Sequence, residues 1–380
     1  MKKLILYFTL LILVSCSPKR ENVTVISDVG IFDGNTYKPN MHLAFDSDGI
    51  IEISSEPIEF KGATVIDGKG KTIIPPLLNA HVHAWNKGHL KEAQDAGVFA
   101  LLDMHNTDET AKAMRDLRNH IVYAHYYSSG PGATVPGGHG TEYGFYVPTI
   151  NDSVSPEKFT LDRIKNGADY IKILREPIMN TIDFKQTDEV IRTAHAGKKL
   201  VVAHVSFPED AARLGAQQID GFAHLWFSKP RANAGQWDSI LKSKAFVIPT
   251  LYVTKKVLEE WEQRPWRDEW LEFEDVLKEV KLAYDKGMII LAGTDAPNND
   301  FNFGTDLYEE LKLLSKAGIP NIDVLKAATT NISTCFKLKE FGVLEKGKPA
   351  SFILIHGNPL NNINDIEKME QIWKLGREIK

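Results

Sequence analysis

Cysteine is scarce in this chain, with only Cys16 and Cys335 among 380 residues. That count excludes the disulfide framework that stabilises many small secreted domains. An excess of positive charge is also missing, because 45 lysines and arginines face 50 aspartates and glutamates, for a net charge of −5. Proteins that bind nucleic acid usually present a basic stripe or patch, so we expect no nucleic-acid partner.

The N-terminus differs from the rest of the chain. Lys2 and Lys3 precede an apolar run over residues 4–14, which is too short to span a membrane as a mature helix and suits a signal peptide. The run ends in Leu-Val-Ser-Cys, which resembles a bacterial lipobox with cleavage before Cys16 and a lipid on its sulfur. A plain secretory signal and a buried first strand are the alternatives.

The lipobox interpretation divides this region into a signal peptide, residues 1–15, and a polar tether, residues 16–22. It predicts an exported bacterial lipoprotein whose body lies on the periplasmic or cell-surface side of a membrane that holds its lipid. With Cys16 lipidated, Cys335 has no intramolecular partner, and we expect it to be a small buried packing residue.

Turn signals divide the rest of the chain into two parts. Residues 23–72 alternate apolar and polar positions between Asp-Gly-type turns, which is typical of short antiparallel strands. Residues 340–380 return to strands, and we expect the two ends to form one small β-sandwich domain. Between them, residues 73–339 alternate short buried strands with helical stretches, as parallel β-α-β units do.

Eight strand-like segments in this middle part predict an α/β fold, the (β/α)8 or TIM barrel, whose active site lies at the C-terminal ends of its strands. The segments are Ile73–His81, Val98–Met104, Ile121–Tyr127, Tyr170–Leu174, Leu200–Val205, Gly221–His224, Phe246–Leu251 and Met288–Gly293. A charged stretch, Lys255–Lys286, is expected to be a long helical insertion before the last strand.

Side chains that can bind metal stand at or near the ends of several of these segments. His81 and His83 are two residues apart and so share a face of their strand. His204 and His224 end two further strands, and Asp295 follows the last one. Taken alone, the His81 and His83 pair is explained equally well by ordinary polar packing, and His204 or His224 alone is better explained as a hydrogen-bonded core histidine. Together, imidazoles and a carboxylate at one barrel mouth can bind two divalent ions and activate water.

Lys172 is unusual on its own, because it lies within the apolar segment Tyr-Ile-Lys-Ile-Leu at residues 170–174. Burying an unpaired ammonium is costly, and a lysine in such a place readily loses its proton. A neutral Lys172 can take up carbon dioxide and become a carbamate, a carboxylate-like group able to bridge two metals. The alternative is a lysine paired with an acid inside the barrel.

The order of these residues resembles the amidohydrolase superfamily, in particular its imidazolonepropionase-like and dipeptidase-like members. Residues 167–173, Gly-Ala-Asp-Tyr-Ile-Lys-Ile, are similar to the strand that carries the bridging lysine in those members. Three outer segments agree: Gly-Gly-His-Gly at 137–140, Ala-Ala-Thr at 327–329 with the tract 342–350, and Gly-Asn-Pro-Leu at 357–360. The likeness extends from Val23 to Leu360.

The resemblance implies a site with two divalent metal ions, usually zinc. It assigns the first ion to His81, His83 and Asp295, and the second to His204 and His224. Carboxylated Lys172 and a hydroxide would bridge the two ions. Asp295 would accept the proton of the hydroxide and pass it to the leaving amine. His139, in the glycine-rich loop, either contacts the substrate or is an ordinary loop histidine.

We therefore expect a hydrolase of carbon–nitrogen amide bonds, acting on a dipeptide, an N-acyl amino acid or a cyclic amide. A lactonase or a deaminase on the same barrel is an alternative, as is a surface solute-binding protein without turnover. Deaminases of this superfamily usually use one metal without a bridging lysine, so Lys172 argues against them.

Some positions depart from the family pattern. Asn79 stands where a carboxylate is usual near the first ligands, which weakens the expected support around them. The segment after Lys172 lacks the Thr-Gly-Gly common in dipeptidase-like members. Arg175, in that segment, either binds a substrate carboxylate or forms a salt bridge. His105 is a further candidate, because it follows a predicted strand at the barrel mouth.

If Cys16 carries a lipid, the wild-type protein expressed in bacteria will partition into detergent. The Cys16→Ala variant will stay in the aqueous phase, because it loses the only acyl anchor. Phase separation followed by immunoblotting measures both. An unchanged soluble fraction for the two proteins would instead indicate a simple secretory signal.

Overall fold

A computed structural model describes residues 22–380 of the chain. The predicted signal peptide, Cys16 and nearly all of the predicted tether lie outside the described residues. Within the described range, the helices are too short or too polar for any of them to cross a membrane.

Two parallel sheets form the central part of the chain. The first contains β6 (Leu77–Val82), β7 (Val98–Asp103) and β8 (His125–Ser128). The second contains, in sequence order, β9 (Ile171–Leu174), β10 (Val201–His204), β11 (Gly221–Ala223) and β12 (Phe246–Ile248). All neighbouring strands within these sheets run parallel. The α/β class predicted from the sequence is therefore confirmed.

Backbone hydrogen bonds outside regular strands connect the two sheets. The Leu291 N–H donates to the Val247 carbonyl (2.9 Å), and the Ala80 N–H donates to the Ala292 carbonyl (2.9 Å). Residues 288–296 thus lie between β12 and β6. The prediction of a regular strand at Met288–Gly293 was wrong, because these residues form only an isolated bridge, between Ile290 and Val247. Across residues 22–380, the assigned strands do not make one continuous closed sheet.

Alternate side chains of the parallel strands face two different cores, as the two-residue period of a strand requires. In β10, Val202 belongs to an inner cluster shared by both parallel sheets, whereas Val201 and Ala203 pack in the cluster that includes the helices. Leu291 joins the inner cluster as well. The irregular segment around Leu291 therefore buries its side chain as a strand in that place would.

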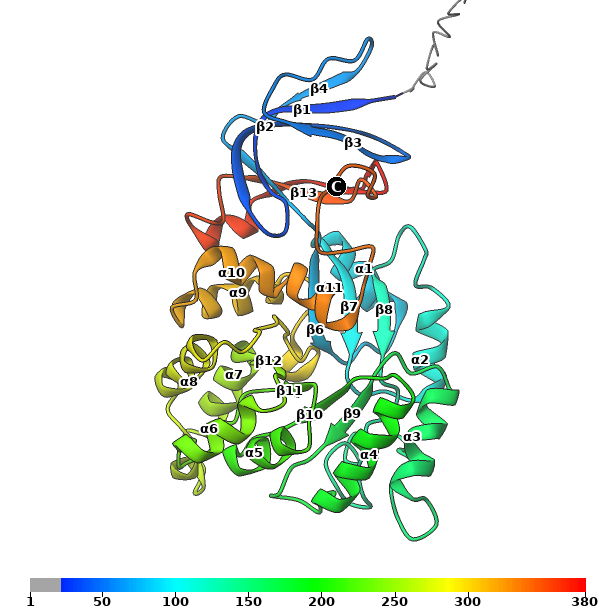
Figure 1. Cartoon of the computed structure of the whole chain (residues 1–380), viewed down its shortest axis with the longest axis vertical. Coiled ribbons are helices and arrows are strands. Elements are labelled where there is room, and N and C mark those ends of the chain that lie inside the picture. Colours follow the sequence, from blue (N-terminus) through cyan, green and yellow to red (C-terminus); the bar gives the residue numbers. More distant parts are fainter. Residues whose placement is uncertain (1–21) are drawn as a thin grey trace, which may run out of the picture.

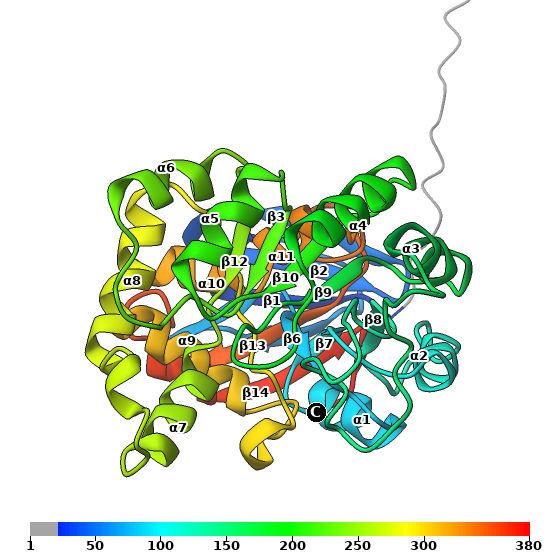
Figure 2. The same ribbon diagram turned by 90° about the horizontal axis from the view of Figure 1, so that it is seen from below.

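Helices lie around the parallel strands (Figure 2). They are α1 (Lys87–Asp95), α2 (Asp108–Arg115), α3 (Pro156–Lys165), α4 (Phe184–Ala196), α5 (Pro208–Ala216), α6 (Ala234–Leu241), α7 (Leu251–Trp261) and α8 (Phe273–Asp285). Side chains cap the N-termini of several of these helices. At α4, Asp183 and Gln186 form a reciprocal capping box.

Three further helices follow Asp295: α9 (Asp306–Lys316), α10 (Asn321–Ala327) and α11 (Thr330–Phe336). Cys335 lies on α11 and packs against the inner cluster, partly rather than fully buried. Burial raises the pKa of its thiol to about 11. Cys335 is therefore a packing residue, as predicted, although less buried than expected.

The stretch predicted as one long helical insertion, Lys255–Lys286, is instead broken into α7, a short 3-10 turn at Arg267–Glu269 and α8. Pro265 lies in the break and cannot continue a helix. Trp270 anchors the turn, because it is buried with its ring centroid 4.8 Å from that of Phe227.

Both ends of the chain contribute to one eight-stranded sheet, which lies at one end of the molecule (Figure 1). Its members are β1 (Thr24–Phe32), β2 (Tyr37–Asp46), β3 (Gly49–Ser54), β4 (Thr64–Asp67), β5 (Lys71–Ile74), β13 (Phe352–His356), β14 (Met369–Lys374) and β15 (Arg377–Glu378). The predicted strand Ile73–His81 is thus two strands in different sheets, β5 and β6. Pro75 and Pro76 separate them, since proline has no N–H for a ladder bond.

Gly293 brings the irregular segment against β6. A Cβ at this position would lie 2.9 Å from both the Cβ and the backbone nitrogen of His81, and 2.6 Å from Ile248 Cγ2. We therefore expect Gly293→Ala to lower the free energy of unfolding by about 1–3 kcal/mol, measured by urea denaturation. Gly235→Ala, in the first turn of α6, is the matched control and should be neutral or stabilising. Equal stability of the two variants would contradict this packing.

Candidate metal centre

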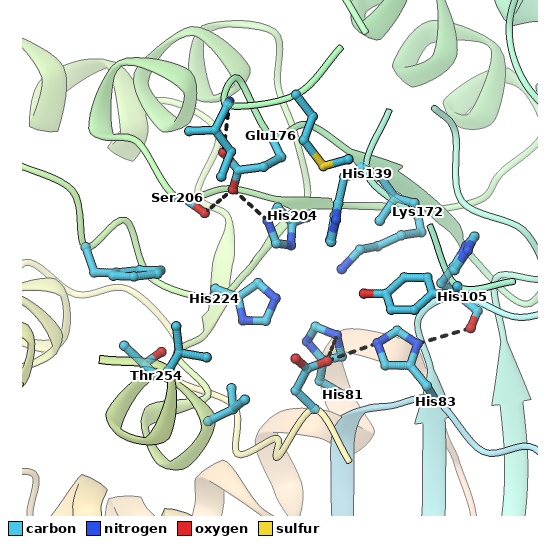
Figure 3. Close-up of a pocket in the computed structure, with 18 of the residues that line it drawn as sticks. His81, His83, His105, His139, Lys172, Glu176, His204, Ser206, His224 and Thr254 are labelled. Carbon is cyan, nitrogen blue, oxygen red and sulfur yellow. Dashed lines mark hydrogen bonds and ion pairs between the residues drawn. The ribbon is translucent and has the colours of Figure 1, made fainter. Parts of the chain in front are cut away.

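The residues singled out by the sequence converge on one cavity of about 240 Å³ (Figure 3). They line it from the C-terminal ends of the parallel strands and from the loop after residue 293, and they are His81, His83, Lys172, His204, His224 and Asp295. Because parallel strands end at the same edge, side chains far apart in sequence meet there.

Asp295 joins the two histidines that come from β6. Its Oδ1 lies 3.0 Å from His81 Nε2 and 2.9 Å from His83 Nε2, and its backbone N–H donates to the His81 carbonyl (2.8 Å). Burial acts to raise the pKa of Asp295, but His81 and His83 outweigh burial and hold that pKa well below its ordinary value. Asp295 is therefore a carboxylate with one oxygen shared between two imidazole nitrogens.

Hydrogen bonds on the outer side fix the tautomers of His83 and His224. His83 Nδ1 lies 3.1 Å from the His105 carbonyl, which can only accept, so Nδ1 carries a hydrogen and the neutral form of the ring has none on Nε2. His224 Nδ1 lies 2.6 Å from Thr250 Oγ1, whose own hydroxyl donates to the Pro249 carbonyl (2.8 Å). Thr250 therefore accepts from His224, and His224 Nε2 is free to bind a metal.

Glu176 fixes the tautomer of His204, in this case by accepting the hydrogen on Nε2 rather than on Nδ1. Its Oε2 lies 3.3 Å from His204 Nε2 and accepts a hydrogen bond from Ser206 Oγ (2.6 Å) (Figure 3). Burial acts to raise the pKa of Glu176, but His204 and Ser206 lower it overall, so the carboxylate accepts the His204 hydrogen. His204 Nδ1 is then left unprotonated. Glu176 was not predicted as a site residue; the sequence shows only that it lies two residues beyond β9.

Burial keeps most of these imidazoles neutral. It lowers the pKa of His81 to about 3 and that of His204 to about 4, and it lowers the pKa of His224 well below its ordinary value. For His83, burial acts in the same direction, but the hydrogen bond and charge of Asp295 prevail and raise its pKa. Neutral imidazole is the form that binds divalent metals.

Lys172 is buried on β9, and its Nζ has no hydrogen-bond partner among the described residues. Burial lowers the pKa of Lys172 to about 7, against the opposing charge of Asp295. Lys172 is therefore not paired with an acid within residues 22–380, which was the alternative. His81 Nδ1 is likewise buried without a partner. Neutral imidazoles, one carboxylate and an unpaired amine form a donor set that fits divalent ions such as zinc.

Ligand atoms of His81, His224 and Asp295 all lie within 4.8 Å of one another. Two of these residues and Thr250 have left-handed backbone conformations, with φ of 68° at His224, 64° at Asp295 and 48° at Thr250. Such conformations are strained for residues other than glycine and gather at functional sites, where the surrounding structure enforces them. The strain fits a site whose ligand directions are imposed by the fold.

Asn79 supports the segment that carries Asp295. Its amide donates to Thr294 Oγ1 (2.9 Å), and its oxygen accepts the N–H groups of Thr294 and His81, both at 3.2 Å. The residue that departs from the family pattern thus ties β6 to the loop after residue 293. Both the nitrogen and the oxygen of the Asn79 side-chain amide are therefore hydrogen-bonded.

Arg175 does not line the cavity. Its Nε lies 3.1 Å from Asp210 Oδ1, and its guanidinium stacks on the ring of Phe184 at 3.9 Å. Of the two possibilities, the structure therefore shows the salt bridge. The cavity lining within the described range does not include Arg175.

The glycine-rich loop is held by His105, which sequence analysis raised as a candidate. Its Nδ1 accepts the Gly132 N–H (2.9 Å), and its Nε2 donates to the Gly140 carbonyl (3.2 Å). His139, on this loop, lines the cavity with its ring centroid 4.5 Å from that of His204, and its Nδ1 lies 2.7 Å from Glu142 Oε1.

Asp103 at the end of β7 was not predicted. It is buried, and it accepts hydrogen bonds from the Ala84 N–H (2.6 Å), the Asn106 amide (3.0 Å) and the His105 N–H (3.2 Å). Burial raises its pKa to about 6. Asp103 therefore fixes the backbone just after His83.

The sequence profile of the Amidohydrolase family matches residues 72–378, and the chain belongs to this family. Membership indicates a hydrolase that acts on carbon–nitrogen bonds. The resemblance to this family inferred from the sequence is therefore confirmed.

Solved structures of low sequence identity share the fold. An Xaa-Pro dipeptidase with methionine bound in its active site has a TM-score of 0.78 and 20% identity, covering 94% of this chain and 100% of the other. A prolidase complexed with N-methylphosphonate-L-proline has a TM-score of 0.77 and 19% identity, covering 94% of this chain and 100% of the other. Ochratoxinase of A. niger has a TM-score of 0.77 and 19% identity, covering 94% of this chain and 96% of the other. Comparison with curated proteins gives no match.

If His204 binds zinc through Nδ1, Glu176→Gln should weaken zinc binding by about 10–100-fold. The neutral amide keeps the shape of the side chain but no longer attracts the His204 hydrogen with a full charge. Titration against a chromophoric chelator measures the affinity. Glu262→Gln, at an exposed acid outside the cavity lining, is the control and should bind zinc as the wild type does. Equal affinity of both variants would refute the role of Glu176.

Proposed function

We propose that the protein is a metal-dependent amidohydrolase that hydrolyses an amide bond of a small-molecule substrate. The observation that carries the proposal is the gathering of unprotonated imidazole nitrogens around Asp295 and Lys172 in one cavity. Membership of the Amidohydrolase family supports it. The neighbours named as a dipeptidase, a prolidase and an ochratoxinase are consistent with it.

The fold that supports this function is proposed to be a (β/α)8 barrel. Hydrogen bonds through residues 288–296 on one side support this proposal, as do those from the Ala133 N–H to the Lys172 carbonyl (2.7 Å) and from the Asp169 N–H to the Ser128 carbonyl (2.8 Å) on the other. We also propose that the sheet built from both chain ends folds as a small β-sandwich domain beside the barrel.

Two divalent ions, taken to be zinc, would be held by the donor set described above. His81 Nε2, His83 Nε2 and Asp295 would hold one, and His204 Nδ1 and His224 Nε2 the other. Lys172, as a neutral amine, would add carbon dioxide at Nζ and release one proton, and the resulting carbamate would supply further oxygen ligands. When bound, such ions lower the pKa of a shared water toward neutrality and polarise the scissile carbonyl.

The chain's own residues would then handle protons and orientation. As the water oxygen bonds to the carbonyl carbon, Asp295 accepts the water's proton on its carboxylate and delivers it to the amide nitrogen when the C–N bond breaks. Glu176 and Thr250 keep His204 and His224 in the required tautomers. His139 lies where it can contact the substrate carbonyl.

We also propose that the protein is an exported bacterial lipoprotein anchored through Cys16. The charged flank, the apolar run and the lipobox-like residues 13–16 support this location. The hydrolase body would act on the periplasmic or cell-surface side.

Zinc-reconstituted protein should release amine from members of a panel of dipeptides, N-acyl amines, N-acyl amino acids and cyclic amides, detected with ninhydrin. Chelator-treated protein should be inactive. Asp295→Asn should lower kcat by at least about 100-fold, because proton transfer by a placed side chain contributes on that order. Asp268→Asn, outside the cavity lining, is the control. Full activity of chelated protein or of Asp295→Asn would contradict the mechanism, and silence across the panel would favour a solute-binding role.

A further inference from the structure

Away from the candidate metal ligands, the cavity wall is largely apolar. It is made by α7 together with the residues that follow β9 and β11, and its members include Leu174, Met179, Phe227, Val253, Val257 and Trp261. Trp261 and Phe227 support each other, with stacked rings whose centroids are 6.4 Å apart. Trp85 and Tyr252 are not part of this wall; Trp85 packs against Phe145, and Tyr252 packs against Phe301.

Positive charge is almost absent from this wall. Lys172 is the one lysine or arginine among the lining residues of the described chain, and it is assigned to the metal bridge. Arg175 is held by Asp210 outside the lining. His139 already faces the Glu142 carboxylate at 2.7 Å, which offsets any charge that it carries.

Negative charge is present instead. The acidic side chain of Glu176 lines the cavity and is buried, and its Oε2 accepts a hydrogen bond from Ser206 Oγ (2.6 Å) and lies 3.3 Å from His204 Nε2. A substrate carboxylate that lies against this wall, away from the metal ligands, would give up water, approach the Glu176 oxygens and meet no lysine or arginine. Leaving a charge buried and unpaired is strongly unfavourable, so the arrangement discriminates against anionic substrates.

We infer that the substrate is an uncharged amide that carries an apolar group and no carboxylate. This inference rests on the proposed function and narrows it, because dipeptides and N-acyl amino acids carry a carboxylate and would be poor substrates. An apolar side group would occupy the wall formed by Val253, Val257 and Trp261, and the amide would face the metal ligands.

A matched pair of compounds tests the inference. N-acetylphenethylamine and N-acetyl-L-phenylalanine differ only in the carboxylate. With zinc-reconstituted wild type, kcat/KM should be at least about tenfold higher for the neutral compound. Val257→Lys should shift this ratio toward the carboxylate by about tenfold or more, because the lysine stem covers the same apolar surface and its ammonium pairs with the anion. Val257→Met, uncharged and of similar length, should keep the preference for the neutral compound.

Binding separates this inference from the proposed reaction. The methanesulfonamides of phenethylamine and L-phenylalanine lack the scissile amide, and calorimetry on the zinc-loaded protein gives their affinities without turnover. Tighter binding of the neutral sulfonamide supports the inference. Equal or tighter binding of the anionic one, or no binding of either, overturns it. If the neutral sulfonamide binds more tightly but neither acetyl compound is hydrolysed, the proposed reaction fails while the assigned ligand class stands.

Discussion

Burial of nitrogen bases in their unprotonated form is the constraint on which the rest of this site depends. Desolvation opposes a positive charge on a buried imidazole or amine, and here it lowers the pKa of His81 to about 3 and that of Lys172 to about 7. The imidazoles of His81, His204 and His224 are therefore neutral near pH 7 and able to offer lone pairs. Asp295 is the compensating anion among them, with His81 and His83 within 3.0 Å of one oxygen. Hydrogen bonds outside these groups, from the His105 carbonyl, Thr250 and Glu176, hold them in place.

Hydrogen bonds one step outside the ligands decide which ring nitrogen is available. The His105 carbonyl, Thr250 and Glu176 each hold an imidazole hydrogen on the outer side. Such outer partners orient metal ligands and tune their basicity. The left-handed backbone at His224, Thr250 and Asp295 belongs to the same arrangement, because the side chains of His224 and Asp295 line the cavity and Thr250 contacts His224 from outside it. The hydrogen bonds and the backbone conformation therefore both orient the imidazole and carboxylate side chains in the cavity.

Much of this could be predicted from the sequence, because ligand types recur at the ends of apolar strands and Lys172 interrupts one of them. Glu176 and Thr250 could not, since their roles come from contacts with His204 and His224 that only the folded chain creates. The helix expected over Lys255–Lys286 failed at Pro265, where burial of Trp270 fixes a turn. The last expected strand failed because residues 288–293 make only isolated backbone bonds, although Leu291 is buried as a strand residue would be.

Counting the zinc ions bound per chain, with and without bicarbonate, tests the account most directly. Elemental analysis after dialysis should find two ions in wild type supplied with bicarbonate, and fewer in Lys172→Ala under the same conditions, because the bridging carbamate cannot form. A wild-type protein that binds no divalent ion would contradict the account, as would a Lys172→Ala variant that keeps both.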